Sequence, residues 1–366
     1  MSRAINKQLS SNITRTADPI FDKGRTLPKE EAITSFFFIS DFMYGGCLTF
    51  TAHLLHTLSR KQVFRIAKRF ERKQRNFGYG IRYQNVPAEY LDGVQNIFIT
   101  DMYQHFECLR KLERRKGKGL GQVTIVIHDP GEISKFNEPY LKYWNIITIR
   151  KSMQQFLRDR YGIKSKFIYH PFYPYLIQDD SNQQEEEEKK KKMQAVSISR
   201  IDFYKNIEII LDANKAARNP VRIYGWANSK YVSQQLDVEA FNQYYQGKYV
   251  KSFNAISEIL RKAKFMVDLS FLPNDGGGTQ YTFLDAIYHN CAIILNRQWI
   301  ENVDPEYRDF KEGENCYAVS NAEELKELLN NAENIDTSKV VQNARRLLDR
   351  HVNNAVDWNK EVTSMG

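Results

Sequence analysis

The stretch "AVSISRIDFYKNIEIILDA", residues 195–213, determines how the second half of the chain is interpreted. A short apolar run ends at Ser199 and a helical apolar pattern follows, which predicts a strand, a tight turn and a helix. Arg200 and Lys205 bracket the turn. A helix N-terminus is already positive, so two cations there favour an anion between them, such as the two phosphates of a diphosphate. The alternative is a pair of solvated surface charges.

Elsewhere in the chain, short apolar runs alternate with helical apolar patterns. This alternation is typical of parallel sheets covered by helices on both faces. It predicts an α/β fold of two Rossmann-like domains that face each other across a cleft, with ligands beyond the carboxyl ends of the strands. The expected strands include 33–42, 96–101, 123–129, 144–150, 195–199, 221–226, 247–253, 265–271 and 291–297.

The expected domain organisation follows from this alternation and from composition. Residues 1–32 are polar and predict a flexible arm, and 33–175 predict an N-terminal Rossmann-like domain. Residues 176–345 predict a C-terminal Rossmann-like domain that begins with an almost fully charged loop at 178–192. Residues 346–366 predict a C-terminal helix that packs back toward the N-terminal domain.

Composition limits the class of protein. Hydrophobic residues make up 42% of the 366 residues, which indicates a globular chain. No run approaches the roughly 18 apolar residues of a membrane span, and the N-terminus lacks the apolar core of a secretory signal. We therefore expect a cytoplasmic protein (in the host cytoplasm if viral). Four isolated cysteines, without metal-type spacing, predict reduced thiols and no metal site.

The formal net charge of +9 is concentrated in the first half, mainly at 59–82 and 109–119. Such runs attract polyanions: nucleic acid, anionic lipid or a phosphorylated substrate. The alternative interpretation is that they are solvated faces of surface helices.

A glycine-rich loop, "PNDGGGTQYTFLDAIYHN" at 273–290, follows a predicted strand and opens a predicted helix. Amides of Gly277 and Gly278 can approach an anion closely, and the helix presents its positive end. Asp285, one turn into that helix, can accept hydrogen bonds from a ribose diol.

The first half of the chain has a glycine turn of its own and a candidate catalytic histidine. Gly45 and Gly46 in "YGGCLT" form a second glycine turn before a helix. His128 and Asp129 lie just past a predicted strand, which makes His128 a candidate catalytic residue. A buried structural histidine is the alternative.

These motifs, in this order, resemble those of the two-domain GT-B glycosyltransferases, in particular the large retaining family four. The resemblance covers nearly the whole chain after residue 33. It implies that the domain at 33–175 binds the acceptor and that the domain at 176–345 binds the donor nucleotide-sugar. It implies that Arg200 and Lys205 neutralise a leaving diphosphate, that Asp285 binds the donor ribose and that His128 lies near the donor sugar. Further donor-binding residues implied by it are Gly45, Gly46, Phe253, Gly277, Gly278, Thr279 and Gln280.

The chain departs from the family at the position eight residues before the ribose-binding acid. The family has a sugar-binding Glu there, and this chain has Gly277. Asp275 or Gln280 are the candidates to replace it, so the donor sugar stays open. The departure is similar to that of divergent viral members, and a shorter resemblance links "YT-x-L" and "GGCLT" to the DNA α-glucosyltransferases of T-even phages.

The resemblance implies a retaining hexosyl or pentosyl transferase that uses a nucleotide-diphosphate sugar, with UDP as the expected nucleotide and without a metal or cofactor. The basic first half suggests a hydroxymethylated DNA base as acceptor. A glycan, a lipid-linked acceptor at a membrane surface, or a nucleotide-binding protein without turnover remain alternatives.

Overall fold

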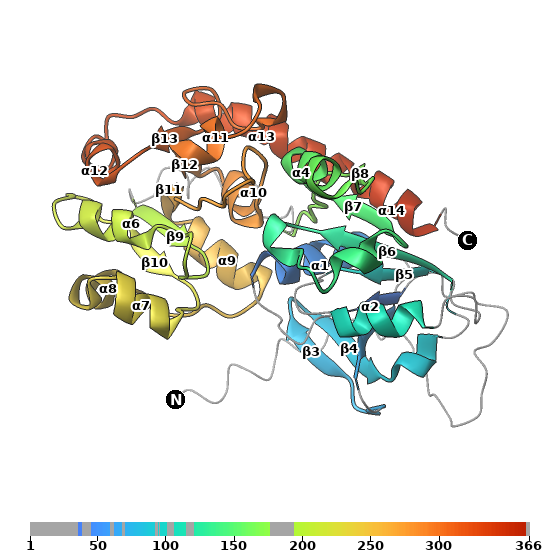
Figure 1. The fold of residues 1–366 in the computed structure, drawn as a ribbon. Helices are drawn as coiled ribbons and strands as arrows, with labels where there is room; N and C mark the ends of the chain where they lie inside the picture. Colours follow the sequence, from blue (N-terminus) through green and yellow to red (C-terminus); the bar gives the residue numbers. More distant parts are fainter. Residues whose placement is uncertain are drawn as a thin grey trace. The chain divides into compact units, whose positions relative to one another are not determined.

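A computed structural model describes residues 36–38, 45–58, 62–67, 70–91, 94, 96–100, 106–114, 121–175 and 194–363. By their contacts, Thr34–Gly366 form one compact unit. The predicted arm at 1–32 and the charged loop at 178–192 lie outside the described residues. Most of the helices and strands are labelled in Figure 1.

The first half forms an eight-stranded sheet in which only one pair of the described strands, β3–β4, is antiparallel. Its short, almost fully buried strands β5 to β7 are the apolar runs expected from the sequence. In sheet order the strands are β3 (Arg75–Gly78), β4 (Ile81–Val86), β2 (Gln62–Ile66), β1 (Phe36–Phe38), β5 (Asn96–Ile99), β6 (Gln122–Ile127), β7 (Asn145–Thr148) and β8 (Lys166–Phe167).

The second half forms a five-stranded sheet, parallel throughout. In sheet order its strands are β10 (Arg222–Tyr224), β9 (Gln194–Ile198), β11 (Ala263–Asp268), β12 (Ala292–Asn296) and β13 (Tyr317–Val319). Two sheets, one parallel throughout and one parallel except for β3–β4, joined to helices are the α/β fold that the alternating pattern predicts, so this prediction is confirmed.

Helices connect the strands of both sheets. Those of the first half are α1 (Gly46–Thr57), α2 (Phe106–Glu113), α3 (Glu138–Leu141) and α4 (Lys151–Tyr161). Those of the second half are α6 (Ile207–Asn214), α7 (Ser229–Gln235), α8 (Val238–Tyr244), α9 (Phe253–Leu260), α10 (Tyr281–Tyr288), α11 (Arg297–Glu301), α12 (Ala322–Asn330), α13 (Ser338–Asn353) and α14 (Ala355–Thr363).

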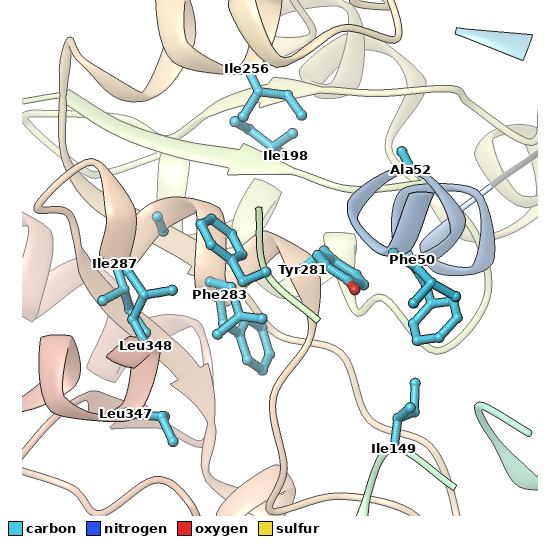
Figure 2. Close-up of a cluster of buried hydrophobic side chains, with 14 of the residues drawn as sticks. Phe50, Ala52, Ile149, Ile198, Ile256, Tyr281, Phe283, Ile287, Leu347 and Leu348 are labelled. Atoms are coloured by element: carbon cyan, nitrogen blue, oxygen red, sulfur yellow. The ribbon is translucent and has the colours of Figure 1, made fainter. Parts of the chain in front are cut away.

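A single apolar cluster links elements of both halves. It includes Phe50 of α1, Ile198 of β9, Tyr281 of α10 and Leu347 of α13, all buried (Figure 2). Because α1 and α10 share this core, the two helix N-termini that the sequence singles out belong to one packed region.

Two local predictions are wrong. Residues 247–252 form no strand, and α9 begins at Phe253. The single C-terminal helix predicted at 346–366 is instead the end of α13 and the whole of α14, separated at Asn354. For the basic run at 59–82, the alternative of surface helices does not hold, because its described residues form β2, β3 and the start of β4.

The last helix, α14, packs on the first half of the chain. The Trp358 ring lies 5.4 Å from that of Phe50, and its indole N–H donates to the carbonyl of Tyr169 at 2.8 Å.

Candidate functional site

The turn between β9 and α6 carries the two cations that the sequence singles out. Lys205 Nζ donates to the Oγ of Ser270, just past β11, at 2.6 Å. It lies 4.0 Å from the carboxylate of Asp268, the last residue of β11. The Thr282 hydroxyl at the start of α10 also donates to Asp268, at 3.1 Å. Lys205 is therefore held beside the N-terminus of α10. Arg200 is half exposed and pairs with Asp202 at 3.1 Å.

Among the described residues, nothing covers the N-terminus of α1. A Cβ at Gly45 or Gly46 would meet none of their atoms within 4 Å, none of their side chains caps the helix, and its first turn holds no acid. At the start of α10, Gln280 makes no side-chain cap bond either. Uncapped N-terminal amides and the helix dipole favour an anion at both ends.

His128 lies just past β6 and is buried. Its Nε2–H donates to the carbonyl of Thr100 at 2.8 Å. Burial lowers the pKa of His128 to about 4, although the bond to Thr100 opposes this. The imidazole is therefore neutral at pH 7, and because Nε2 carries the proton, Nδ1 carries the lone pair.

Position 277 cannot carry the glutamate of the family in this loop. Gly277 has φ +68, and a Cβ there would lie 2.5 Å from Val303. Its N–H donates to the carbonyl of Trp299 at 2.6 Å, and the Gly276 N–H donates to Asp275 at 3.0 Å. In this arrangement both N–H groups donate to oxygen atoms of the protein and not to a phosphate.

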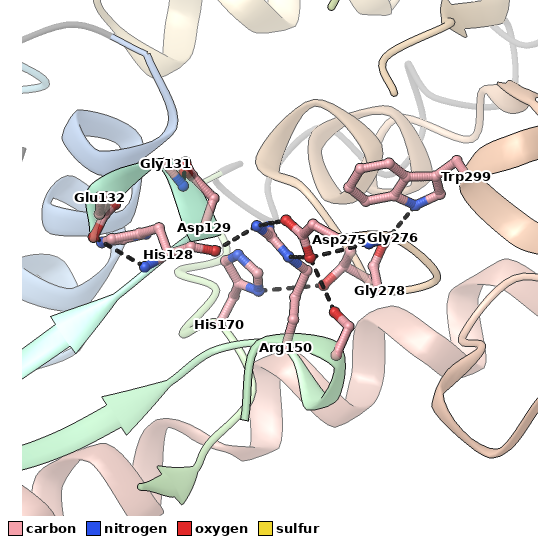
Figure 3. Close-up of polar contacts among 12 residues, drawn as sticks. His128, Asp129, Gly131, Glu132, Arg150, His170, Asp275, Gly276, Gly278 and Trp299 are labelled. Atoms are coloured by element: carbon pink, nitrogen blue, oxygen red, sulfur yellow. Dashed lines mark hydrogen bonds and ion pairs between the residues drawn. The ribbon is translucent and has the colours of Figure 1, made fainter. Parts of the chain in front are cut away.

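Asp275, the sequence candidate for the missing glutamate, is fully engaged. Arg150 Nε and Ser152 Oγ both donate to its Oδ1 at 2.9 Å, and Arg150 Nη2 donates to its Oδ2. The same Nη2 also donates to the carbonyl of His128 (Figure 3). Burial by itself lowers the pKa of Arg150. The attraction of the Asp275 carboxylate is the stronger effect, so the pKa of Arg150 is raised. The ion pair therefore ties the loop of His128 to the glycine loop.

The side chain of Arg150 needs the glycine at 278. A Cβ there would lie 2.8 Å from Arg150 Cγ. Thr279 is also buried, with its hydroxyl 3.3 Å from His170 Nδ1 and 3.2 Å from His351 Nε2. Gly278 and Thr279 thus pack the junction between the halves, and Gln280 alone of this run is partly exposed.

Asp285 is buried among aromatic side chains. Its Oδ1 accepts from the Tyr175 hydroxyl at 2.9 Å and lies 3.9 Å from His53 Nε2. Burial, and secondarily His56, lower the pKa of His53, so His53 is neutral and is no counterion. Tyr175 also stacks on Phe253 at 4.3 Å. The Tyr175 hydroxyl thus occupies one of the two carboxylate oxygens of Asp285. The ribose-binding role of Asp285 and the donor-binding role of Phe253 stay predictions.

Replacing Asp285 with Asn tests this burial through the pH dependence of stability. Burial raises the pKa of Asp285 from 3.8 to about 7, more than the Tyr175 bond lowers it. Between these values the unfolded chain binds fewer protons, so Asp285 makes the protein less stable as pH rises. D285N should be more stable than wild type at pH 8, by on the order of 4 kcal/mol, with little difference near pH 4.

Urea unfolding at pH 4 and pH 8 measures this difference. D357N, at an exposed acid of α14, is the control and should show no such pH dependence. If D285N and wild type differ in free energy of unfolding by the same amount at pH 4 and at pH 8, the carboxyl of Asp285 is not buried without a compensating charge.

One group of described residues could hold a metal. Ligand atoms of Cys47, His128 and Glu132 lie within 4.8 Å of one another, and zinc accepts this set. The Cys47 thiol is 3.6 Å from Glu132 Oε1 in a hydrogen bond. Cys47 lies in the first turn of α1, and the positive end of that helix disfavours a cation at this cluster.

Sequence reasoning missed Arg150, Ser152, His53 and Tyr175. A signal for Arg150 was present: it follows a buried strand and is the N-cap of α4. A cation is disfavoured at such a place without an anion, which is the argument applied to Arg200 and Lys205.

No protein-family model matches the chain, and no curated protein matches its sequence. Solved structures do match its fold. HepE of Anabaena, in complex with UDP and glucose, is 14% identical with a TM-score of 0.66, over 91% of this chain and 98% of that one. A glycosyltransferase of Rickettsia africae is 12% identical with a TM-score of 0.59, over 90% and 98%.

An α-glucosyltransferase in complex with UDP and a 13-mer DNA containing an HMU base is 10% identical, with a TM-score of 0.61 over 90% of this chain and 98% of that one. The chain therefore has the GT-B fold of these glycosyltransferases, as its sequence predicts. Among the described residues, no helix combines the length and apolar character needed to cross a membrane.

Proposed function

We propose that the protein transfers a sugar from a nucleotide-diphosphate sugar, with UDP as the nucleotide, to a hydroxyl acceptor with retention of configuration. The observation that carries this proposal is the placement of Lys205 beside the uncapped start of α10, with Arg200 in the same turn. Similar structures that contain UDP support the choice of nucleotide.

The chemistry follows from charge. As the bond from the anomeric carbon to the diphosphate breaks, negative charge grows on the leaving oxygen, and Arg200, Lys205 and the helix N-termini stabilise it. The acceptor oxygen forms its bond to the anomeric carbon on the face that the diphosphate leaves, so the configuration is retained without a protein nucleophile. A donor phosphate oxygen takes the acceptor proton, so the reaction needs no protein base. His128 accepts a hydrogen bond from the donor sugar through Nδ1. Fixed cations do the work that a metal does in other transferases.

A calorimetric screen of UDP, GDP, ADP and their common sugars tests the donor. We expect one nucleoside diphosphate to bind in buffer treated with a chelator. Absence of binding by all of them would refute a diphosphate site at Arg200 and Lys205.

For the acceptor, we propose a hydroxymethylated base in DNA. Exposed cations on and beside β3 and β4, namely Arg72, Lys73 and Arg82, would contact phosphates, and one structure of similar fold holds DNA. Transfer to DNA should fall steeply as salt rises from 50 to 200 mM, by about 10-fold or more. Transfer only to a saccharide or a lipid-linked acceptor, or nucleotide binding without transfer, would select the alternatives.

A further inference from the structure

The turn that carries Lys205 is bonded to the segment that follows β11. Three successive residues of the turn meet three successive residues past the strand, in reverse order. The Tyr204 carbonyl accepts from the Phe271 N–H at 2.9 Å, Lys205 Nζ donates to Ser270 Oγ at 2.6 Å, and the Asn206 side-chain amide donates to the Leu269 carbonyl at 2.8 Å. Lys205 thus lies in the middle of a continuous contact and not at the tip of a free turn.

The backbone of the turn depends on this contact. Tyr204 has φ +67 and Asn206 has φ +49, in the left-handed region that residues with a side chain rarely adopt. Such conformations persist where the surrounding structure holds them. The bonds from Phe271 and to Leu269 hold them here, so the position of Lys205 is set by the segment past β11.

Asp268 links that segment to the start of α10. Its side chain is 1% exposed. Its Oδ1 accepts from the backbone N–H of Ser270 at 2.9 Å and also from the Ser270 hydroxyl. Its Oδ2 accepts from the hydroxyl of Thr282, the second residue of α10, at 3.1 Å. One buried carboxylate therefore bonds to the residue that holds Lys205 and to the first turn of α10.

The direction of these bonds matters for Lys205. The hydroxyl proton of Ser270 is donated to Asp268, so the lone pairs of Ser270 Oγ are left for the Lys205 ammonium. Asp268 Oδ2 also lies 4.0 Å from Lys205 Nζ, where opposite charges attract. Without the carboxylate the Ser270 hydroxyl is free to rotate, and the ammonium loses both constraints.

We propose that Asp268 is a positioning residue that fixes the Lys205 ammonium and the N-terminus of α10 in one arrangement toward the donor diphosphate. The inference rests on the proposed function, since it takes the ligand of Lys205 to be the diphosphate of a nucleotide sugar. A fixed cation stabilises growing negative charge best because it need not reorient during the reaction. A carboxylate repels phosphate, so Asp268 acts through Ser270 and Thr282 and does not bind the donor.

Kinetics and calorimetry separate positioning from binding. D268N keeps the shape of the side chain and removes its charge. With UDP-glucose as donor and duplex DNA containing hydroxymethylcytosine as acceptor, D268N should lower kcat by about 10-fold or more, as small displacements of a catalytic group do. It should bind UDP no more weakly than wild type, because the carboxylate also offsets part of the Lys205 charge. A wild-type kcat, or a loss of kcat matched by an equal loss of UDP affinity, would overturn the inference.

The double variant D268N/S270A tests the route of the effect. Once the Ser270 hydroxyl is absent, D268N should lower kcat little further, because both changes interrupt the same chain of bonds. Losses that multiply would mean that Asp268 does not act through Ser270. T282V, which removes the second bond and keeps the shape of the side chain, should lower kcat, whereas T282S keeps the hydroxyl and should resemble wild type.

D212N is the matched control, since it makes the same chemical change at a carboxylate of α6 that is 59% exposed. It should leave both kcat and the affinity for UDP unchanged. If wild type binds none of UDP, GDP and ADP, the proposed function itself fails, and the inference with it. If wild type binds and transfers but D268N does so equally fast, only the inference fails.

An NMR signal of the Lys205 ammonium gives a readout that needs no turnover, so it decides the inference even where UDP-glucose is not the donor. An ammonium held by hydrogen bonds exchanges its protons slowly enough to be observed. Wild type and D212N should show this signal, identified by its loss in K205A, and D268N should not. A signal as strong in D268N as in wild type, or no signal in wild type, would refute the fixed arrangement.

Discussion

Replacing Arg200 or Lys205 with alanine is expected to lower the rate of sugar transfer by about 10²-fold or more, because each removes a preorganised cation from the developing charge. Lys205 is held by Ser270 at 2.6 Å, so little reorganisation accompanies the reaction. Steady-state kinetics should show the loss in kcat, with a smaller change in KM, since charge on the diphosphate increases between ground state and transition state.

The control for this experiment is K215A. Lys215 is half exposed and follows α6 in the same half of the chain, where it pairs with Asp212 at 2.9 Å. It should leave the rate unchanged. S270A, which removes only the hydroxyl that holds Lys205, should lower kcat by less than K205A. Wild-type rates in both R200A and K205A would refute the assignment.

Replacing Arg150 with methionine is expected to destabilise the protein by about 3–5 kcal/mol, because Asp275 would keep a buried charge without its partner. D275L should cost a similar amount, by leaving the guanidinium unpaired. The double variant R150M/D275L should be more stable than the sum of the two losses predicts, since neither charge then remains.

Denaturant unfolding of wild type, R150M, D275L and the double variant measures the coupling free energy between Arg150 and Asp275. R345M is the control: Arg345 is partly buried and donates to the neutral Asn290 side chain at 2.9 Å, so its loss leaves no orphan charge. Strictly additive losses for Arg150 and Asp275 would contradict the ion pair. If the double variant folds, its kcat should still be low, because the carbonyl of His128 has lost its donor.

Much of the fold follows from local sequence patterns. Alternation of buried runs and helical periods predicts both parallel sheets, because each strand and helix depends on residues a few positions apart. The hairpin of β3 and β4 was missed, since its charged residues resemble a solvated surface. A glycine turn in "RNFGYGIRY" was the available signal.

The candidate site likewise has parts that local sequence patterns predict and parts that they do not. The turn at Arg200 and Lys205 and the open glycine start of α1 are local, so the sequence by itself determined them, together with the α/β fold. Only the tertiary structure decided that Asp275 meets Arg150, 125 residues earlier, and that Tyr175 covers Asp285. These contacts depend on how loops from two sheets meet, and the desolvation that sets their charge states appears only when both sides are packed.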